Sequence, residues 1–161
     1  MQEIKCAYIF DVDGTLADCS HRLHFILPKG KNVADLETYK PDWDAFYSAC
    51  MDDKAIMDVV SIWRRLAADP HVEMLFVTGR PEKYKSLTFE WLCKWVNPKL
   101  CNLYMRTDGD HRPDWMVKAE LYEKYIKGHY FIQGVFEDRL SCVNMWRNLG
   151  LTCYQVADGN Y

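Results

Sequence analysis

Residues 4–15 read IKCAYIFDVDGT, and the interpretation of the whole chain starts from this stretch. Residues 4–10 form an almost unbroken apolar run, which is typical of a strand buried on both faces of a parallel sheet. The polar residues that follow, with Gly14, predict that the strand ends there. Asp11 and Asp13 thus come directly after a buried strand, and Gly14 permits the sharp turn that such a loop needs.

The pattern Asp-x-Asp-Gly has more than one explanation. Asp-Gly is a common turn dipeptide, and similar spacing opens calcium-binding loops. A calcium loop would carry an acidic residue roughly six positions past its glycine and would follow a helix, and neither condition holds here. In an enzyme, one of two such carboxylates can attack a substrate while the other moves protons.

Outward from this stretch, β-rich runs alternate with residues at helical spacing. Four more strands are expected, at residues 72–77, 100–105, 130–136 and 151–156. Helical stripes lie at residues 56–67, 84–95 and 140–149, and Asp114 is expected to cap a further helix that ends near Lys127. The alternation predicts an α/β, Rossmann-like fold with a mostly parallel sheet of about five strands and helices on both faces.

The length of 161 residues suits one domain over residues 1–161. Residues 18–53 break the alternation, and we expect them to form a small cap insert above the sheet. No apolar run is long enough to cross a membrane and no signal peptide is recognisable, so we expect a cytoplasmic protein. The 7 cysteines include no C-x-x-C pair and are expected to be reduced.

Three further polar clusters are expected to meet Asp11 at the carboxyl edge of the sheet, where open α/β sheets bind ligands. Thr78-Gly79-Arg80 suits a phosphate oxygen, or is an ordinary turn. Lys118 can hold an anion, or is a solvated surface charge. Adjacent Glu137 and Asp138 repel each other unless a cation such as Mg²⁺ lies between them and a third carboxylate; the alternative is a helix cap.

These motifs in this order resemble the haloacid dehalogenase (HAD) superfamily of phosphohydrolases: FDVDGTLAD at residues 10–18, VTGR at 77–80, Lys118 and FEDR at 136–139. The pattern R-x-D-G-D-x-R-x-D-x-x-x-K at residues 106–118, together with the C-terminal residues 137–161, resembles the 3′-phosphatase domain of bacteriophage polynucleotide kinase-phosphatases. The resemblance implies a HAD-like fold over nearly the whole chain.

The resemblance also implies roles for individual residues. Asp11 is the expected nucleophile, which forms an aspartyl-phosphate, and Asp13 is the general acid and then the base. Because Asp13 must carry a proton when it meets the leaving alkoxide, we expect neighbouring carboxylates to raise its pKa. The expected Mg²⁺ ligands are Asp11, the backbone carbonyl of Asp13, Asp138 and, directly or through a neighbour, Glu137. The expected substrate-binding positions are Thr78, Gly79, Arg80, Arg106, Arg112, Asp114 and Lys118, of which Thr78 and Lys118 hold the phosphoryl oxygens.

The implied activity is that of a magnesium-dependent phosphomonoesterase acting on the 3′-phosphate of nucleic-acid ends. The sequence lacks the G-x-x-x-x-G-K-[ST] loop of a kinase, so no kinase activity is expected. The net charge of −3 excludes a global positive field and favours an alternative, a phosphatase of free mononucleotides. A third alternative is an inactive binding module.

The expected partners are phosphorylated nucleic-acid ends or nucleotides, with neither a membrane nor an obligate protein partner. Within the cap insert, several residues can receive a phosphate backbone and a base, or can simply pack and solubilise the insert: His21, Arg22, His24, Lys29, Lys31 and Trp43.

Overall fold

The computed structural model describes residues 4–27, 39–99 and 102–159. Its main sheet has five strands in the order β5-β4-β1-β6-β7, and every neighbouring pair is parallel. This arrangement confirms the predicted fold class. The strands are β1 (Lys5–Phe10), β4 (Val72–Pro81), β5 (Asn102–Arg106), β6 (Tyr130–Glu137) and β7 (Cys153–Gln155).

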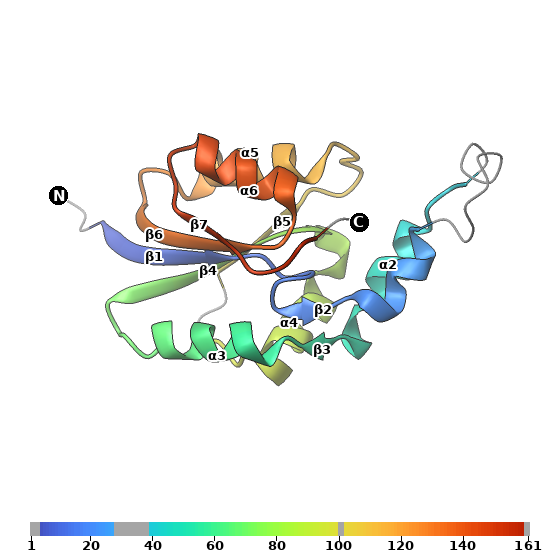
Figure 1. Ribbon diagram of the computed structural model, residues 1–161, viewed down its shortest axis with the longest axis horizontal. Helices are drawn as coiled ribbons and strands as arrows, with labels where there is room; N and C mark the ends of the chain where they lie inside the picture. Colours follow the sequence, from blue (N-terminus) through green and yellow to red (C-terminus); the bar gives the residue numbers. More distant parts are fainter. Residues whose placement is uncertain (1–3, 28–38, 100–101, 160–161) are drawn as a thin grey trace.

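Alternate residues of each strand pack into two separate cores, one on each face of the sheet. In β1, Ala7 and Ile9 join the core that contains Trp146, and Phe10 joins the core that contains Trp63. Helices therefore cover both faces, with one pair above the sheet and one pair below it in Figure 1. The pairs are α3 (Met57–Leu66) with α4 (Lys85–Trp95), and α5 (Asp114–Tyr125) with α6 (Leu140–Asn148).

Two boundaries differ from the prediction in ways that affect the polar edge. Strand β4 continues to Pro81, so Thr78, Gly79 and Arg80 lie in a strand rather than in a turn. The reason is the pairing with β5, which resumes at Pro81 after an irregularity in the register. Asp114 is the first residue of α5 and does not cap it, because its carboxylate is directed to Arg106 and Lys118 instead.

The segment expected to form a cap insert, residues 18–53, lies between β1 and α3. Strands β2 (Ala17–Asp18) and β3 (Lys54–Ala55) pair antiparallel at its base. Beyond them lie the helical segments η1 (Ser20–Phe25), α2 (Trp43–Ser48) and η2 (Ala49–Asp52). Figure 1 shows α2 at the right, beyond the carboxyl ends of the strands.

Lys29 and Lys31, expected in the insert, fall outside the described residues. The 6 cysteines of the described ranges are all free thiols. Within those ranges, no helix is both long and apolar enough to span a membrane.

Candidate active site

The carboxyl edge of the sheet carries a pocket of about 440 Å³. Its floor is built by Asp11 at the end of β1, Thr78 in β4, and Glu137 and Asp138 at the end of β6. Lys118 reaches the same floor from α5. The parallel order of the strands brings these residues together, because it places their carboxyl ends side by side.

Lys118 is a buried cation surrounded by carboxylates. Its ammonium Nζ lies 2.7 Å from Asp11 Oδ1, 2.8 Å from Glu137 Oε2 and 3.2 Å from Asp114 Oδ2. Burial opposes its charge, but the three carboxylates outweigh burial and raise the pKa of Lys118 well above its usual value. The interpretation of Lys118 as a solvated surface charge is therefore wrong.

Three buried acidic side chains lie close enough to share one cation. Asp11, Glu137 and Asp138 each offer one carboxylate oxygen, and these oxygens all lie within 4.8 Å of one another. Burial raises the pKa of Asp11 to about 8, that of Glu137 to about 7 and that of Asp138 to about 6, and repulsion between the carboxylates adds to the effect. The raised pKa values mean that Lys118 alone does not neutralise this cluster. A cluster of hard oxygen donors with excess negative charge fits a divalent cation such as Mg²⁺.

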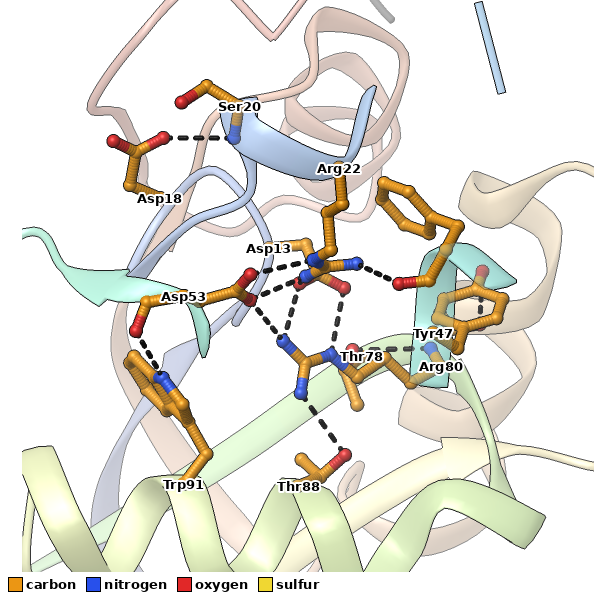
Figure 2. Close-up of polar contacts among 12 residues, drawn as sticks. Asp13, Asp18, Ser20, Arg22, Tyr47, Asp53, Thr78, Arg80, Thr88 and Trp91 are labelled. Atoms are coloured by element: carbon orange, nitrogen blue, oxygen red, sulfur yellow. Dashed lines mark hydrogen bonds and ion pairs between the residues drawn. The ribbon is translucent and has the colours of Figure 1, made fainter. Parts of the chain in front are cut away.

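Asp13 has entirely different surroundings from Asp11. Its carboxylate accepts hydrogen bonds from Arg80 Nε at 2.9 Å and Arg80 Nη2 at 2.6 Å, and a further one from Arg22 Nη2 (Figure 2). Burial opposes ionisation of Asp13, but the charges of Arg80 and Arg22 outweigh it and lower the pKa of this carboxyl. The expectation that neighbouring carboxylates raise the pKa of Asp13 is therefore wrong, because its neighbours are guanidinium groups.

Asp53 completes this arginine pair and was not singled out from the sequence. It accepts hydrogen bonds from Arg22 Nε at 2.7 Å and Nη2 at 2.6 Å, and from Arg80 Nη2 at 3.2 Å. His21 Nε2 lies 2.8 Å from the same carboxylate. Asp53 closes the cap insert, and no periodicity or motif in that segment marks it.

Arg22 and Arg80 do not lie where substrate contacts were expected. Both side chains are wholly buried, and neither residue lines the pocket. The guanidinium groups of the two arginines form ion pairs with Asp13 and Asp53. The arginines therefore hold the Asp13 carboxylate in place and do not face the pocket.

Thr78 and Gly79 form the wall beside Asp11. The Thr78 hydroxyl accepts a hydrogen bond from the backbone N–H of Arg80 at 3.2 Å. A Cβ atom on Gly79 would lie 2.0 Å from Asp114 Oδ1, so glycine is required for the close approach of α5. Thr78, Gly79 and Asp114 all line the pocket.

Arg106 and Arg112 line the pocket, but both are engaged with the protein. Arg106 donates to the carbonyl oxygens of Gly79, Asp110 and Arg112, at 2.7, 3.1 and 2.7 Å. It thereby fixes the loop between β5 and α5. Arg112 is half exposed and pairs with Asp110 at 2.7 Å and Glu120 at 2.6 Å.

The cap insert contributes an aromatic wall to the pocket. Trp43, Phe46 and Tyr47 of α2 line it. His21 and His24 are not among the lining residues. Of the described insert residues expected to meet a substrate, Trp43 alone faces the pocket.

Comparison with known proteins identifies the family of the chain. The family model of the polynucleotide kinase PNKP phosphatase domain matches residues 39–161. A protein of Autographa californica nuclear polyhedrosis virus, named as a bifunctional polynucleotide kinase/RNA ligase, is 29% identical over 143 residues. The match covers 89% of this chain and 18% of the viral protein. The chain thus spans a small part of that relative.

Solved structures give the same fold. A chain of a Pnkp1/Rnl/Hen1 complex superposes with a TM-score of 0.76 at 27% identity, covering 100% of this chain and 49% of that one. A class C acid phosphatase from Bacillus anthracis superposes with a TM-score of 0.69 at 15% identity, covering 99% of this chain and 69% of that one. With the family match over most of its length, the chain is a HAD-type phosphatase and belongs to the family of polynucleotide kinase PNKP phosphatase domains.

Proposed function

We propose that this chain is a magnesium-dependent phosphomonoesterase that forms an aspartyl-phosphate on Asp11 and acts on 3′-phosphate ends of nucleic acids. One observation carries the proposal. A buried carboxylate lies at the floor of a pocket, 2.7 Å from a buried ammonium group and within 4.8 Å of two further acids. An anionic nucleophile can approach an anionic phosphate ester only where positive charge is concentrated, and the buried ammonium group together with a cation among the three acids would supply that charge.

In the first step, a carboxylate oxygen of Asp11 attacks the phosphorus atom, and the bond between phosphorus and the leaving alkoxide oxygen breaks. Lys118 and the Thr78 hydroxyl stabilise the phosphoryl oxygens during this transfer. The ion would be held by Asp11, Glu137, Asp138 and the backbone carbonyl of Asp13. It would supply Lewis-acid stabilisation of the phosphoryl charge. In the second step, water attacks the same phosphorus and regenerates Asp11 and free phosphate.

Asp13 is the proposed proton carrier, because it lines the pocket and lies outside the acidic cluster. Its two arginine partners favour the carboxylate form. Asp13 is therefore well prepared to accept a proton from the water that hydrolyses the aspartyl-phosphate. Asp13 then donates that proton to the leaving alkoxide of the next substrate molecule. Asp13 is therefore neutral for part of the cycle, although both arginines favour its ionised form.

The proposed substrate class follows from the family rather than from a single contact. The matching family is the phosphatase domain of polynucleotide kinases. The viral relative is named as a polynucleotide kinase/RNA ligase, and a second solved structure that matches is described as an RNA repair complex. We therefore propose that the chain removes 3′-phosphates from nucleic-acid ends.

The test is phosphate release in Mg²⁺ from four substrates: a 3′-phosphorylated oligonucleotide, its 5′-phosphorylated isomer, a 3′-mononucleotide and a 5′-mononucleotide. The Asp11→Asn variant is the blank, because it keeps the shape of the side chain and removes the nucleophile. Selective hydrolysis of 3′-phosphates supports the proposal. Preference for the 5′-mononucleotide would move the protein to nucleotide metabolism, and turnover by Asp11→Asn would exclude Asp11 as the nucleophile.

A further inference from the structure

An exposed tryptophan lies on the wall of the candidate active site. Trp43 is 44% exposed and lines the pocket whose floor holds Asp11 and Lys118. Large aromatic side chains are usually removed from water, because their burial is strongly favourable. A half-exposed indole that lines the same pocket as Asp11 and Lys118 is therefore available to a ligand.

The Trp43 ring is held in place by other aromatic rings. It stacks on Tyr47 with 5.9 Å between centroids and 24° between planes, and it meets Phe46 edge-on at 5.8 Å. Tyr47 in turn contacts Tyr84 at 5.4 Å. Asp42 caps the helix that carries these rings, accepting a hydrogen bond from Ala45 N at 2.9 Å. A ring held this firmly loses little conformational entropy when a ligand stacks on it.

Three of the cationic side chains that line the same pocket form ion pairs with carboxylates. Lys83 Nζ lies 2.6 Å from Asp44, and Arg112 lies 2.7 Å from Asp110. Arg106 lies 3.3 Å from Asp114. Binding of a nucleic-acid backbone gains its free energy from unmatched Lys and Arg side chains that displace counterions. Within the described residues, these three paired cations therefore contribute little binding free energy of that kind.

We propose that Trp43 is the stacking platform for the base of the terminal nucleotide, so that the pocket recognises one phosphorylated nucleoside and grips little of the adjoining chain. The inference rests on the proposed phosphatase function and specifies what that site reads. The base lies against the indole while the phosphate reaches the floor near Asp11. Stacking accepts any base, because every base has an aromatic face.

The test compares substrates that differ only in the terminal base. One is an oligonucleotide with a 3′-phosphate on a normal terminal nucleotide, and the other carries the 3′-phosphate on an abasic residue. Trp43→Ala should raise KM for the first by about 5- to 100-fold, which is the fold-change that loss of one base–aromatic stack produces. It should leave kcat, and KM for the abasic substrate, nearly unchanged. Trp43→Phe should restore most of the affinity.

The matched control is Trp115→Ala. Trp115 is 42% exposed in the first turn of α5, and it is not among the residues that line the pocket. Removal of the Trp115 side chain should change KM for neither substrate. Equal KM changes for both substrates in Trp43→Ala, or none for either, would overturn the stacking role and make Trp43 a packing residue or a contact for another protein.

Chain length and salt test the second half of the inference. Extending the substrate from a 3′-mononucleotide to a decanucleotide should lower KM by less than about threefold, with weak salt dependence. A tenfold or larger gain with a steep salt slope would show that the backbone is gripped after all.

A binding experiment tests the stacking role of Trp43 independently of phosphatase activity. Binding of a nucleoside 3′-phosphate and a nucleoside 5′-phosphate to the Asp11→Asn protein is compared with binding of deoxyribose phosphate, without turnover. Tighter binding of either base-bearing ligand, lost in the Asp11→Asn/Trp43→Ala double variant, supports the platform even if no 3′-phosphate is hydrolysed. Equal binding of all three ligands would overturn it.

Discussion

Asp11 and Asp13 lie two residues apart in one loop, and the protein surrounds them with opposite charges. Asp11 shares one buried ammonium group with Glu137 and Asp114, and its pKa is raised to about 8 by burial and by Glu137. Asp13 faces two buried guanidinium groups, which overcome burial and lower its pKa. The surroundings of Asp11, the proposed nucleophile, thus lack positive charge, whereas the carboxylate of Asp13, the proposed proton carrier, is already compensated by two arginines.

This contrast in charge supports the proposed metal ion. Asp11 must be ionised to attack phosphorus, and a divalent ion among Asp11, Glu137 and Asp138 would favour that form. Asp13 needs no ion, because Arg22 and Arg80 already compensate it. The same loop can therefore present one carboxylate as a metal-assisted nucleophile and the other as a base.

Removing the metal ion should have the largest effect on activity, because the surroundings of Asp11 lack positive charge without it. A chelator should abolish phosphate release, and Mg²⁺ should restore it. Mg²⁺ should also raise the unfolding temperature, since an ion that binds the folded state stabilises it by mass action. The measurement is turnover beside a thermal melt, with Asp138→Asn as the variant that loses the thermal shift. Full activity in excess chelator would show that Asp11 does not need a divalent cation for the reaction.

Removing one of the arginines beside Asp13 should lower the stability of the protein. Arg80→Met leaves the partly buried Asp13 and the buried Asp53 with one guanidinium group between them, which should cost about 3–5 kcal/mol of unfolding free energy. Chemical denaturation measures this loss. Arg112→Met is the control, because Arg112 is half exposed, and its unfolding midpoint should stay nearly unchanged. Equal losses in the two variants would show that the buried arginines carry no special weight.

Sequence patterns predicted the sheet and the floor of the site for a common reason. Buried parallel strands are continuous apolar runs, and their carboxyl ends meet at one edge. Asp11, Thr78 and the pair Glu137-Asp138 were placed by this rule alone. Lys118 was expected at the same edge, because it lies near the start of the helix after the third expected strand, and the resemblance added its role.

The surroundings of Asp13 could not be predicted in the same way. Arg22 and Asp53 come from an insert without helical or strand periodicity, so no pattern indicates which of its charges are buried. Arg80 follows Thr78 in a motif, but the irregular pairing of β4 with β5 changes the local geometry. Charge pairing across an insert depends on three-dimensional contacts, and a single sequence does not record them.

A smaller effect should follow from crowding the contact between β4 and α5. In Gly79→Ala, the new Cβ would lie 2.0 Å from Asp114 Oδ1 and would displace this carboxylate from Arg106 and Lys118. Overpacking of this kind costs about 1–3 kcal/mol. We expect kcat to fall about tenfold, because Lys118 loses one of the groups that position it. Unchanged kcat together with unchanged stability would show that the Asp114 carboxylate can move aside without cost.

The smallest expected effect is a pH dependence of the metal-free protein. The folded-state pKa values of Asp11, Glu137 and Asp138 are raised, so their contribution to stability is present at low pH and is lost as pH rises through about 6 to 8. Asp13, with its lowered pKa, contributes in the opposite sense and loses its contribution only in strong acid. In chelator, the unfolding temperature should therefore fall between pH 5 and pH 8 by several degrees.

Mg²⁺ competes with the protons on these three carboxyls, so the Mg²⁺-induced thermal shift should grow over the same pH range. The difference between melts with and without Mg²⁺ isolates the cluster from other titrating groups. A thermal shift of equal size at pH 5.5 and pH 8 would mean that the acidic cluster does not bind the ion.

Trapping the covalent intermediate tests the central contrast most directly. An aryl phosphate is the suitable substrate, because its leaving group needs no proton and the first step then depends on Asp11 alone. Asp13→Asn should form a phosphoenzyme, release one equivalent of phenol in a burst and hydrolyse the intermediate slowly, and mass spectrometry of the acid-quenched protein should place the phosphate on Asp11. Asp11→Asn should give neither burst nor phosphoenzyme. A phosphoenzyme in Asp11→Asn, or none in Asp13→Asn despite steady turnover, would contradict the assignment of the two carboxylates.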